Sequence, residues 1–244
     1  MTVKEKLYFT REQLQAHGPI NIVILGDSVS HGAMNGYIDY ESVYWNRLRK
    51  RLNAVRDYVP VNMICAAIGG TTAADALPRL HTQVLCHAPD LVVVCYGLND
   101  VNGALSEFTD ALAQIFDACL CHGCEVIYMT PNMLNTSVAP DTPSEYLDYA
   151  KKTAELQNGG RMDTFMHAAC EIAKQKGVAV CDCYADWKAL SLTEDVTARL
   201  INRINHPTSA MHALFADRLF ALIMDNDIPE NNDTFTDDSM TKSK

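Results

Sequence analysis

Four polar clusters of this 244-residue chain contain residue types that could carry out acyl transfer. The hydroxyl of Ser28 is a candidate nucleophile, and such a hydroxyl needs a base to take its proton. His206, which stands directly before Pro207, is the best-placed candidate for that base. The backbone N–H groups of Ser28 and Gly70 and the side-chain amide of Asn99 could stabilise a developing oxyanion.

The first three clusters follow short apolar runs rich in valine and isoleucine, which predict buried strands. In an open parallel sheet, ligands bind beyond the carboxyl ends of the strands, so these clusters are expected at one shared edge. The predicted strands are Asn21–Leu25, Val61–Ala66, Leu91–Tyr96, Glu125–Thr130 and Val178–Cys183.

Helical patterns alternate with the strands, which indicates parallel strands joined by right-handed crossovers. The predicted helices are Tyr44–Val55, Ala73–Cys86, Leu105–Cys121, Thr164–Lys176 and Ser209–Met224. We expect one domain over residues 1–228. The long connection 131–161, with a short helical pattern at Glu145–Leu156, is either a lid or substrate wall or an ordinary surface insertion. The polar segment 229–244 is predicted to be disordered.

The four clusters in this order resemble the GDSL, or SGNH, hydrolases, whose four blocks carry Ser, Gly, Asn and His. Gly26-Asp27-Ser28 is similar to the first block, with Val29 in place of the usual leucine, and Gly70, Asn99 and His206 match the other three. The resemblance covers about residues 21–221. It implies a three-layer α/β/α sandwich with a five-stranded parallel sheet in the flavodoxin-like order 2-1-3-4-5, and ester or thioester hydrolysis with neither a metal nor another cofactor.

Two residues depart from the pattern of that family. Ala67 stands where a glycine is frequent, which we expect to change loop packing. The family also writes its last block as Asp-x-x-His, whereas the residue three before His206 is Arg203, which cannot accept the imidazole N–H. The ring could be oriented by a backbone carbonyl or by the side chain of Asn202, Asn205, Asp186, Glu194 or Asp195. The sequence does not rank these alternatives. A slower Ser–His dyad is predicted.

Each candidate residue also has a structural interpretation. Gly-Asp-Ser is a common turn, Asn99 and Asp100 could cap helices, and His206 could simply enter a helix. Asp27 is expected to support the turn that presents Ser28 and to border the substrate pocket. His31 is expected either to line that pocket or to be a hydrogen-bonded surface residue.

The overall composition excludes several function classes. The net charge is −10, and the longest basic cluster is Arg49-Lys50-Arg51, so nucleic acid is not an expected partner. Residues 1–18 contain no apolar stretch of signal-peptide length and no membrane-spanning run follows, which predicts a cytoplasmic protein without a membrane partner.

The nine cysteines are odd in number and scattered, which favours reduced core residues over a metal site at Cys119, Cys121, His122 and Cys124. The oligomeric state is left open.

The predicted function is therefore a serine carboxylic ester hydrolase that removes a small acyl group, which could be carried by a carbohydrate. Lysophospholipase or thioesterase activity is the alternative within the same class. A protein that keeps the fold but has lost turnover is the alternative suggested by Arg203. A flavodoxin-like nucleotide or flavin binder is disfavoured, because no Gly-x-Gly-x-x-Gly follows the first predicted strand.

Overall fold

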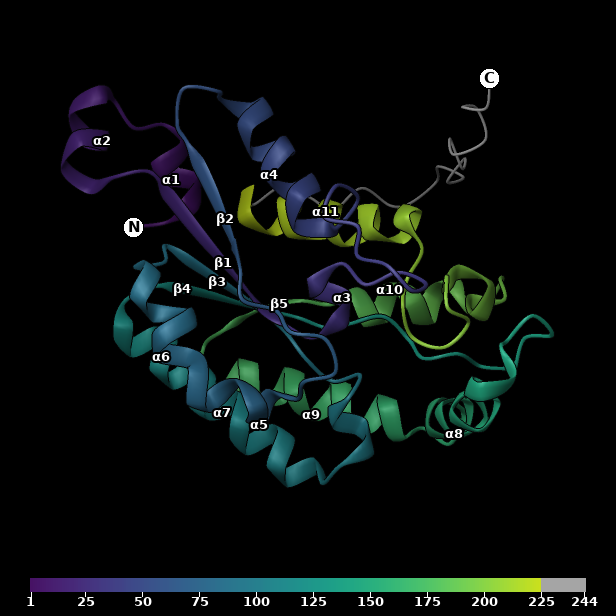
Figure 1. The fold of residues 1–244 in the computed structure, drawn as a ribbon. Helices are drawn as coiled ribbons and strands as arrows, with labels where there is room; N and C mark the ends of the chain where they lie inside the picture. Colours follow the sequence, from purple (N-terminus) through teal and green to yellow (C-terminus); the bar gives the residue numbers. More distant parts are fainter. Residues whose placement is uncertain (225–244) are drawn as a thin grey trace, which may run out of the picture.

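The computed structural model describes residues 1–224, and its strands form a single parallel sheet in the order β2-β1-β3-β4-β5 (Figure 1). The strands are β1 Ile20–Gly26, β2 Val61–Cys65, β3 Leu91–Cys95, β4 Glu125–Met129 and β5 Ala179–Cys181. The predicted five-stranded sheet and its order are confirmed. The segment 229–244, for which we predicted disorder, lies outside the described residues.

Burial explains why the strands are continuous apolar runs. All five residues of β3 are buried, as expected for a parallel strand covered by helices on both faces. β1 lies between β2 and β3, with Ile24 opposite Cys65 and Gly26 opposite Cys95. This register brings the chain segments that follow β1, β2 and β3 to one edge of the sheet.

Helices cover both faces of the sheet. In Figure 1, α4 and α11 lie on one face, and α5, α6, α7 and α9 lie on the other. The helices are α1 Val3–Leu7, α2 Arg11–His17, α3 Ser28–His31, α4 Tyr44–Val55, α5 Ala73–Ala76, α6 Leu80–Gln83, α7 Leu105–His122, α8 Leu147–Asn158, α9 Arg161–Gln175, α10 Cys183–Leu190 and α11 Ser209–Met224. Short 3₁₀ turns occupy Leu77–Arg79, Leu85–His87, Asp100–Asn102, Ser144–Tyr146 and Val196–Arg199.

Some elements differ from the sequence prediction for identifiable reasons. The single helix expected over 73–86 is broken into α5, α6 and two 3₁₀ turns, and Pro78, which lacks an N–H, lies in the first of these turns. Cys183 begins α10 and does not end a strand, because the side chain of Asp182 caps that helix by accepting from the Ala185 N–H. The short helices α1 and α2 were not predicted, although Thr2 and Thr10 begin capping boxes.

The last residue of β1 packs against α3 so closely that only glycine fits. A Cβ at Gly26 would lie 2.7 Å from the Cys95 backbone oxygen and 2.5 Å from the Ser30 Oγ. We therefore expect Gly26→Ala to lower the free energy of unfolding by about 1–3 kcal/mol, the usual cost of overpacking, in urea denaturation. Gly103→Ala is the control, because its nearest contact would be an ordinary 3.5 Å. Equal stability of the two variants would contradict this account.

Candidate active site

Ser28 is the first residue of α3, directly after β1. The carboxylate of Asp27 caps this helix by accepting a hydrogen bond from the Val29 N–H at 3.0 Å. The backbone N–H of Ser28 lies in the first turn, where N–H groups have no acceptor within the helix. The sharp passage from β1 to α3 thus presents the Ser28 hydroxyl together with a backbone donor.

The imidazole of His206 bridges Ser28 and a backbone carbonyl. Its Nε2 lies 3.0 Å from the Ser28 Oγ, and its Nδ1 lies 2.8 Å from the carbonyl oxygen of Met34. A carbonyl can only accept, so Nδ1 must carry the ring hydrogen and donate it to Met34. This leaves the lone pair of Nε2 facing the Ser28 hydroxyl, which is the tautomer that a general base requires.

The loop before His206 is held by the side chain of Asn202. Its Oδ1 accepts from three successive backbone N–H groups, those of Ile204, Asn205 and His206, at 2.9 to 3.1 Å. The Nδ2 of Asn202 donates to the Oδ1 of Asn205. Both asparagines, which we considered as groups that orient the ring, therefore act on the loop, and the Met34 carbonyl contacts the ring.

The acidic residues considered for the same role have other partners. Asp186 pairs with Arg218, Glu194 pairs with Arg199, and Asp195 caps the 3₁₀ turn at Thr197. Of the options left open by the sequence, the backbone carbonyl is the one that the structure brings to the imidazole.

Arg203 occupies the usual aspartate position but makes different contacts. Its φ of +61° is uncommon for a residue with a side chain, and its guanidinium binds both carboxylate oxygens of Asp141 at 3.0 and 3.1 Å. It also donates to the carbonyl oxygen of Ala198 at 3.1 Å. Arg203 therefore ties the His206 loop to the segment 131–161.

The remaining expected donors lie on the loops after β2 and β3. Gly70 has φ +78° in a turn closed by the Thr71 N–H and the Ile68 carbonyl, a geometry that requires glycine as its third residue. The Nδ2 of Asn99 donates to the Thr71 carbonyl at 2.9 Å. An amide carries two hydrogens, so Asn99 can hold the Gly70 turn and still offer one donor to an oxyanion.

Burial shifts the pKa of several groups at this edge. Desolvation lowers the pKa of His206 below 6.5, and the hydrogen bond to Met34 opposes that shift. Desolvation also raises the pKa of Asp27 to about 7 and that of Asp100 to about 6, although each accepts a backbone N–H. His206 is consequently neutral at pH 7, as a base must be before it takes a proton.

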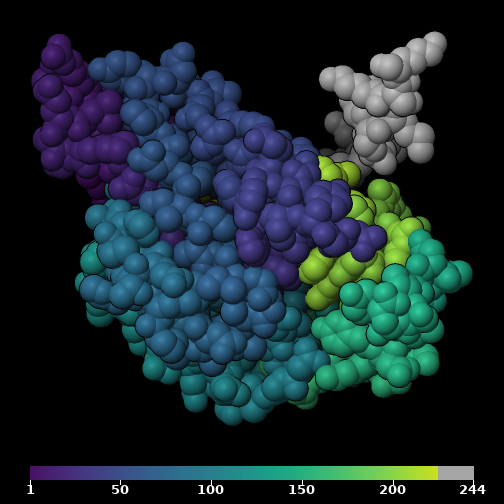
Figure 2. Space-filling model, in the orientation of Figure 1, coloured from purple at the N-terminus to yellow at the C-terminus, as the bar shows by residue number. Residues whose placement is uncertain are grey.

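Ser28 and His206 line a cavity of about 470 Å³. Gly70, Asn99, Asn35 and Asn205 line it too, and the segment 131–161 contributes Asp141, Pro143, Tyr146 and Tyr149. The loop after α3, the segment 131–161 and the segment before α11 adjoin on the face shown in Figure 2, in blue-violet, teal and yellow-green. The segment 131–161 is thus a wall of the cavity and not an ordinary surface insertion, the two roles that the sequence left open for it.

Two residues expected at the substrate pocket lie elsewhere. Asp27 has no exposed surface, because its carboxylate is turned inward to cap α3. The Nε2 of His31 lies 3.2 Å from the Tyr40 hydroxyl, and His31 is not among the residues that line the cavity. For His31, this geometry corresponds to the hydrogen-bonded surface residue.

Three contributors to the site were not predicted from the sequence. Tyr146 and Tyr149 stand three residues apart at the start of a helical pattern, and this spacing could have marked them as neighbours on one face. No signal could have identified the Met34 carbonyl, because every residue has one.

Residues 24–214 match the GDSL-like lipase/acylhydrolase family. The chain belongs to this family. The match includes Ser28, Gly70, Asn99 and His206, and an esterase or acylhydrolase is the activity that the family supports.

Solved structures of family esterases have the same fold. The acetylxylan esterase Axe2 from Geobacillus stearothermophilus superimposes with a TM-score of 0.66 at 19% identity, over 87% of this chain and 97% of that one. A lipase/acylhydrolase from Enterococcus faecalis gives a TM-score of 0.66 at 23% identity, over 84% of this chain and 96% of that one. At these identities the likeness concerns the fold.

The uncharacterized lipoprotein YqeF of Bacillus subtilis (strain 168) is 28% identical over 134 residues, which span 51% of this chain and 53% of that protein. The chain thus matches about half the length of this relative.

The description of YqeF as a lipoprotein contradicts our prediction of a cytoplasmic location. That prediction used the lack of an apolar stretch in residues 1–18 and of a later membrane-spanning run, and such absences do not determine a location. Among residues 1–224, no helix is both long and apolar enough to cross a membrane.

The environment of His206 predicts the pH dependence of hydrolysis. The imidazole must be neutral to accept a proton, and desolvation lowers its pKa, so activity should persist below pH 6.5 and fall only at lower pH. The acid limb of kcat/KM, measured together with an NMR titration of the His206 ring, checks this. A midpoint for His206 at or above 6.5 would contradict it.

Proposed function

We propose that this chain is a metal-independent serine esterase in which Ser28 and His206 act as a dyad oriented by the Met34 carbonyl. One observation carries the proposal: His206 lies within hydrogen-bond distance of the Ser28 Oγ and of an acceptor that fixes its tautomer. Every role that acyl transfer requires then falls to a group of this chain.

The reaction begins when the Ser28 Oγ attacks the acyl carbon and His206 Nε2 takes the hydroxyl proton. The backbone N–H groups of Ser28 and Gly70 and the Asn99 amide receive the oxyanion of the tetrahedral intermediate. The C–O bond to the alcohol then breaks, and the imidazolium returns its proton to the departing oxygen. Water, deprotonated by the same imidazole, attacks the acyl-enzyme and releases the acid and free Ser28.

The Met34 carbonyl determines the tautomer of the His206 ring and also how well the imidazolium is stabilised. It holds the Nδ1 hydrogen, so the ring faces Ser28 in the productive tautomer. It is neutral, however, and stabilises the imidazolium less than a carboxylate would. We therefore expect slower turnover than in a triad, without loss of the mechanism.

The lining of the cavity favours a small acyl group carried by a carbohydrate. A volume of about 470 Å³ is in the range of small-ligand sites, roughly 300–1,000 Å³. Asn35 and Asn205 offer amides suited to sugar hydroxyls, and Tyr146 offers an aromatic surface that is 52% exposed. The acetylxylan esterase among the structural neighbours acts on an acetylated sugar polymer, which agrees with this substrate class.

Covalent labelling tests the nucleophile. A fluorophosphonate should modify the wild-type protein at neutral pH, with the adduct on the Ser28 peptide, because an activated serine attacks phosphorus as it attacks an acyl carbon. Ser28→Ala should remain unlabelled, and Ser30→Ala should be labelled like the wild type, because the Ser30 Oγ is buried against the Tyr44 hydroxyl. An unlabelled wild type would instead favour a binding protein that retains the fold.

Substitution of Tyr146 tests the carbohydrate assignment. Tyr146→Ala should lower kcat/KM for an acetylated xylo-oligosaccharide by roughly tenfold, or about 1.4 kcal/mol, through lost stacking on the sugar. Hydrolysis of p-nitrophenyl acetate should change little, because this substrate has no sugar. Tyr8→Ala is the matched control, with a tyrosine of similar exposure (57%) that does not line the cavity. Preference of the wild type for a lysophospholipid or a thioester would reject a carbohydrate ester as the substrate.

A further inference from the structure

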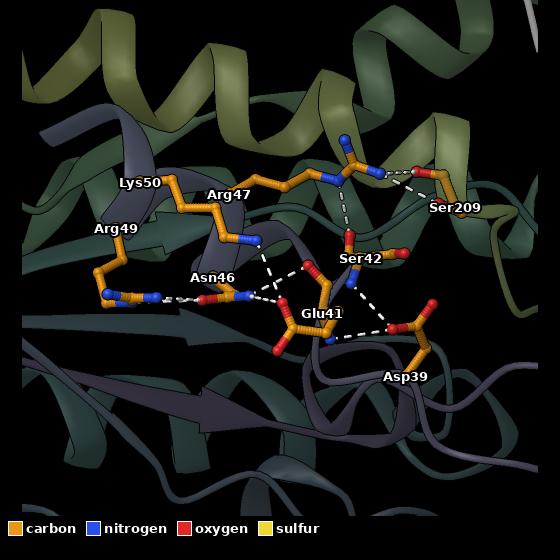
Figure 3. Close-up of polar contacts among 8 residues, drawn as sticks. All are labelled: Asp39, Glu41, Ser42, Asn46, Arg47, Arg49, Lys50 and Ser209. Carbon is orange, nitrogen blue, oxygen red and sulfur yellow. Dashed lines mark hydrogen bonds and ion pairs between the residues drawn. The ribbon is translucent and has the colours of Figure 1, made fainter. Parts of the chain in front are cut away.

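A polar network at the start of α4 connects the two chain segments that meet at His206 (Figure 3). One segment is the loop 32–43, which carries the Met34 carbonyl. The other is the segment 206–209, which runs from His206 into α11. The guanidinium of Arg47 contacts both segments, and Figure 3 shows it between Ser42 and Ser209.

The loop that carries Met34 is fixed by a series of backbone hydrogen bonds. The Met34 N–H donates to the Tyr37 carbonyl at 2.9 Å, and the Asp39 N–H donates to the Gly32 carbonyl at 2.8 Å. The carboxylate of Asp39 then accepts from the Ser42 N–H at 2.9 Å. The position of Met34 is in this way connected to that of Ser42.

Arg47 completes the connection from Ser42 to α11. Its Nε donates to the Ser42 carbonyl at 2.7 Å, while its Nη2 donates to the Ser209 Oγ at 3.0 Å and to the Ser209 carbonyl at 3.2 Å. The guanidinium is planar and rigid, so these bonds hold Ser42 and Ser209 at a fixed separation. Ser209 is the first residue of α11 and lies three residues after His206.

The bond between His206 and Met34 is sensitive to that separation. Its two partners are 172 residues apart in sequence, and the acceptor is a backbone atom that cannot change rotamer to follow the ring. A carboxylate side chain could adjust to a small displacement, whereas a carbonyl moves only with its loop.

We infer that Arg47 is a positioning residue for the hydrolytic reaction, one that holds the Met34 carbonyl on His206 Nδ1. The inference rests on the proposed Ser–His mechanism. Arg47 acts through Ser42 and Ser209 and touches neither the substrate nor the reacting atoms.

Two neighbouring arginines provide matched controls on the same helix. Arg51 forms an ion pair with Asp217 on α11, so it joins the same two helices away from the loop. Arg49 donates to the Oδ1 of Asn46 within α4. Loss of Arg51 should affect stability without disturbing the Met34 carbonyl. Arg49 reaches the loop 32–43 only through Asn46, which donates to the Glu41 carbonyl, so its loss should disturb the loop less than loss of Arg47.

The test compares Arg47→Ala, Arg47→Lys, Arg51→Ala and Arg49→Ala, each assayed well below its thermal midpoint. Arg47→Ala should lower kcat for p-nitrophenyl acetate by roughly tenfold with an unchanged KM, the loss expected when a general base is misaligned. Its acid limb should move to lower pH, because the hydrogen bond to Met34 raises the pKa of His206. Arg47→Lys, a point donor that cannot reach both partners, should be intermediate. Arg51→Ala and Arg49→Ala should keep kcat within twofold, even where the thermal midpoint falls.

Nitrogen NMR of the His206 ring provides a measurement that does not need turnover. In the wild type Nδ1 should carry the hydrogen, and in Arg47→Ala the two tautomers should mix. A wild type with a fixed Nδ1 hydrogen but no turnover would reject the proposed function and leave the positioning role in place. A wild-type kcat and ring spectrum in Arg47→Ala would overturn the role of Arg47. An equal loss of kcat in Arg51→Ala would also overturn it, because the effect would then belong to general packing of α4 on α11.

Discussion

The hydrogen bond from His206 to the Met34 carbonyl is the interaction on which the candidate site depends. It selects the ring tautomer, and so decides whether Nε2 can face the Ser28 hydroxyl with a lone pair. Because the acceptor belongs to the backbone, its alignment is set by the fold of two segments and not by one side chain. The surrounding polar contacts are best understood as the means of fixing those two segments.

The loops at the carboxyl edge of the sheet are also tied to one another by side chains that bind backbone. Asn99 after β3 donates to the Thr71 carbonyl after β2, and the buried carboxylate of Asp100 accepts from the Ala73 N–H at 2.8 Å. Burial raises the pKa of both Asp27 and Asp100, and the nearby Asp100 adds to the shift of Asp27, which is an energetic cost at neutral pH. In return, the two buried carboxylates hold the loops that place Ser28, Gly70 and Asn99 at the same cavity.

The sequence was informative where function requires a particular residue type. A hydroxyl, an imidazole and a glycine are recognisable in the chain. The alternation of apolar runs and helical patterns predicted a parallel sheet, and the resemblance to the SGNH hydrolases implied its strand order. The sequence was not informative where a role can be filled by the backbone of any residue, or where tertiary contacts determine which residue fills it. Nothing in the sequence distinguishes the Met34 carbonyl from any other. Whether a side chain or a carbonyl contacts the His206 ring depends on which loop the fold brings to it. Local chemistry that was overlooked explains other differences, such as the break of the predicted helix 73–86 around Pro78.

The segment 131–161 connects the loop that precedes His206 with the wall of the cavity. Its Asn132 donates to the Asn205 carbonyl at 2.9 Å, and its Asp141 holds Arg203, so it braces the loop that precedes His206. Farther along, the same segment contributes Tyr146 to the cavity wall. The left-handed φ of Arg203 has an energetic cost, and in this conformation its guanidinium pairs with Asp141. In place of a carboxylate on the imidazole, this chain therefore has an arginine that anchors the His206 loop to the wall of the cavity, so a change in that wall also acts on the position of His206.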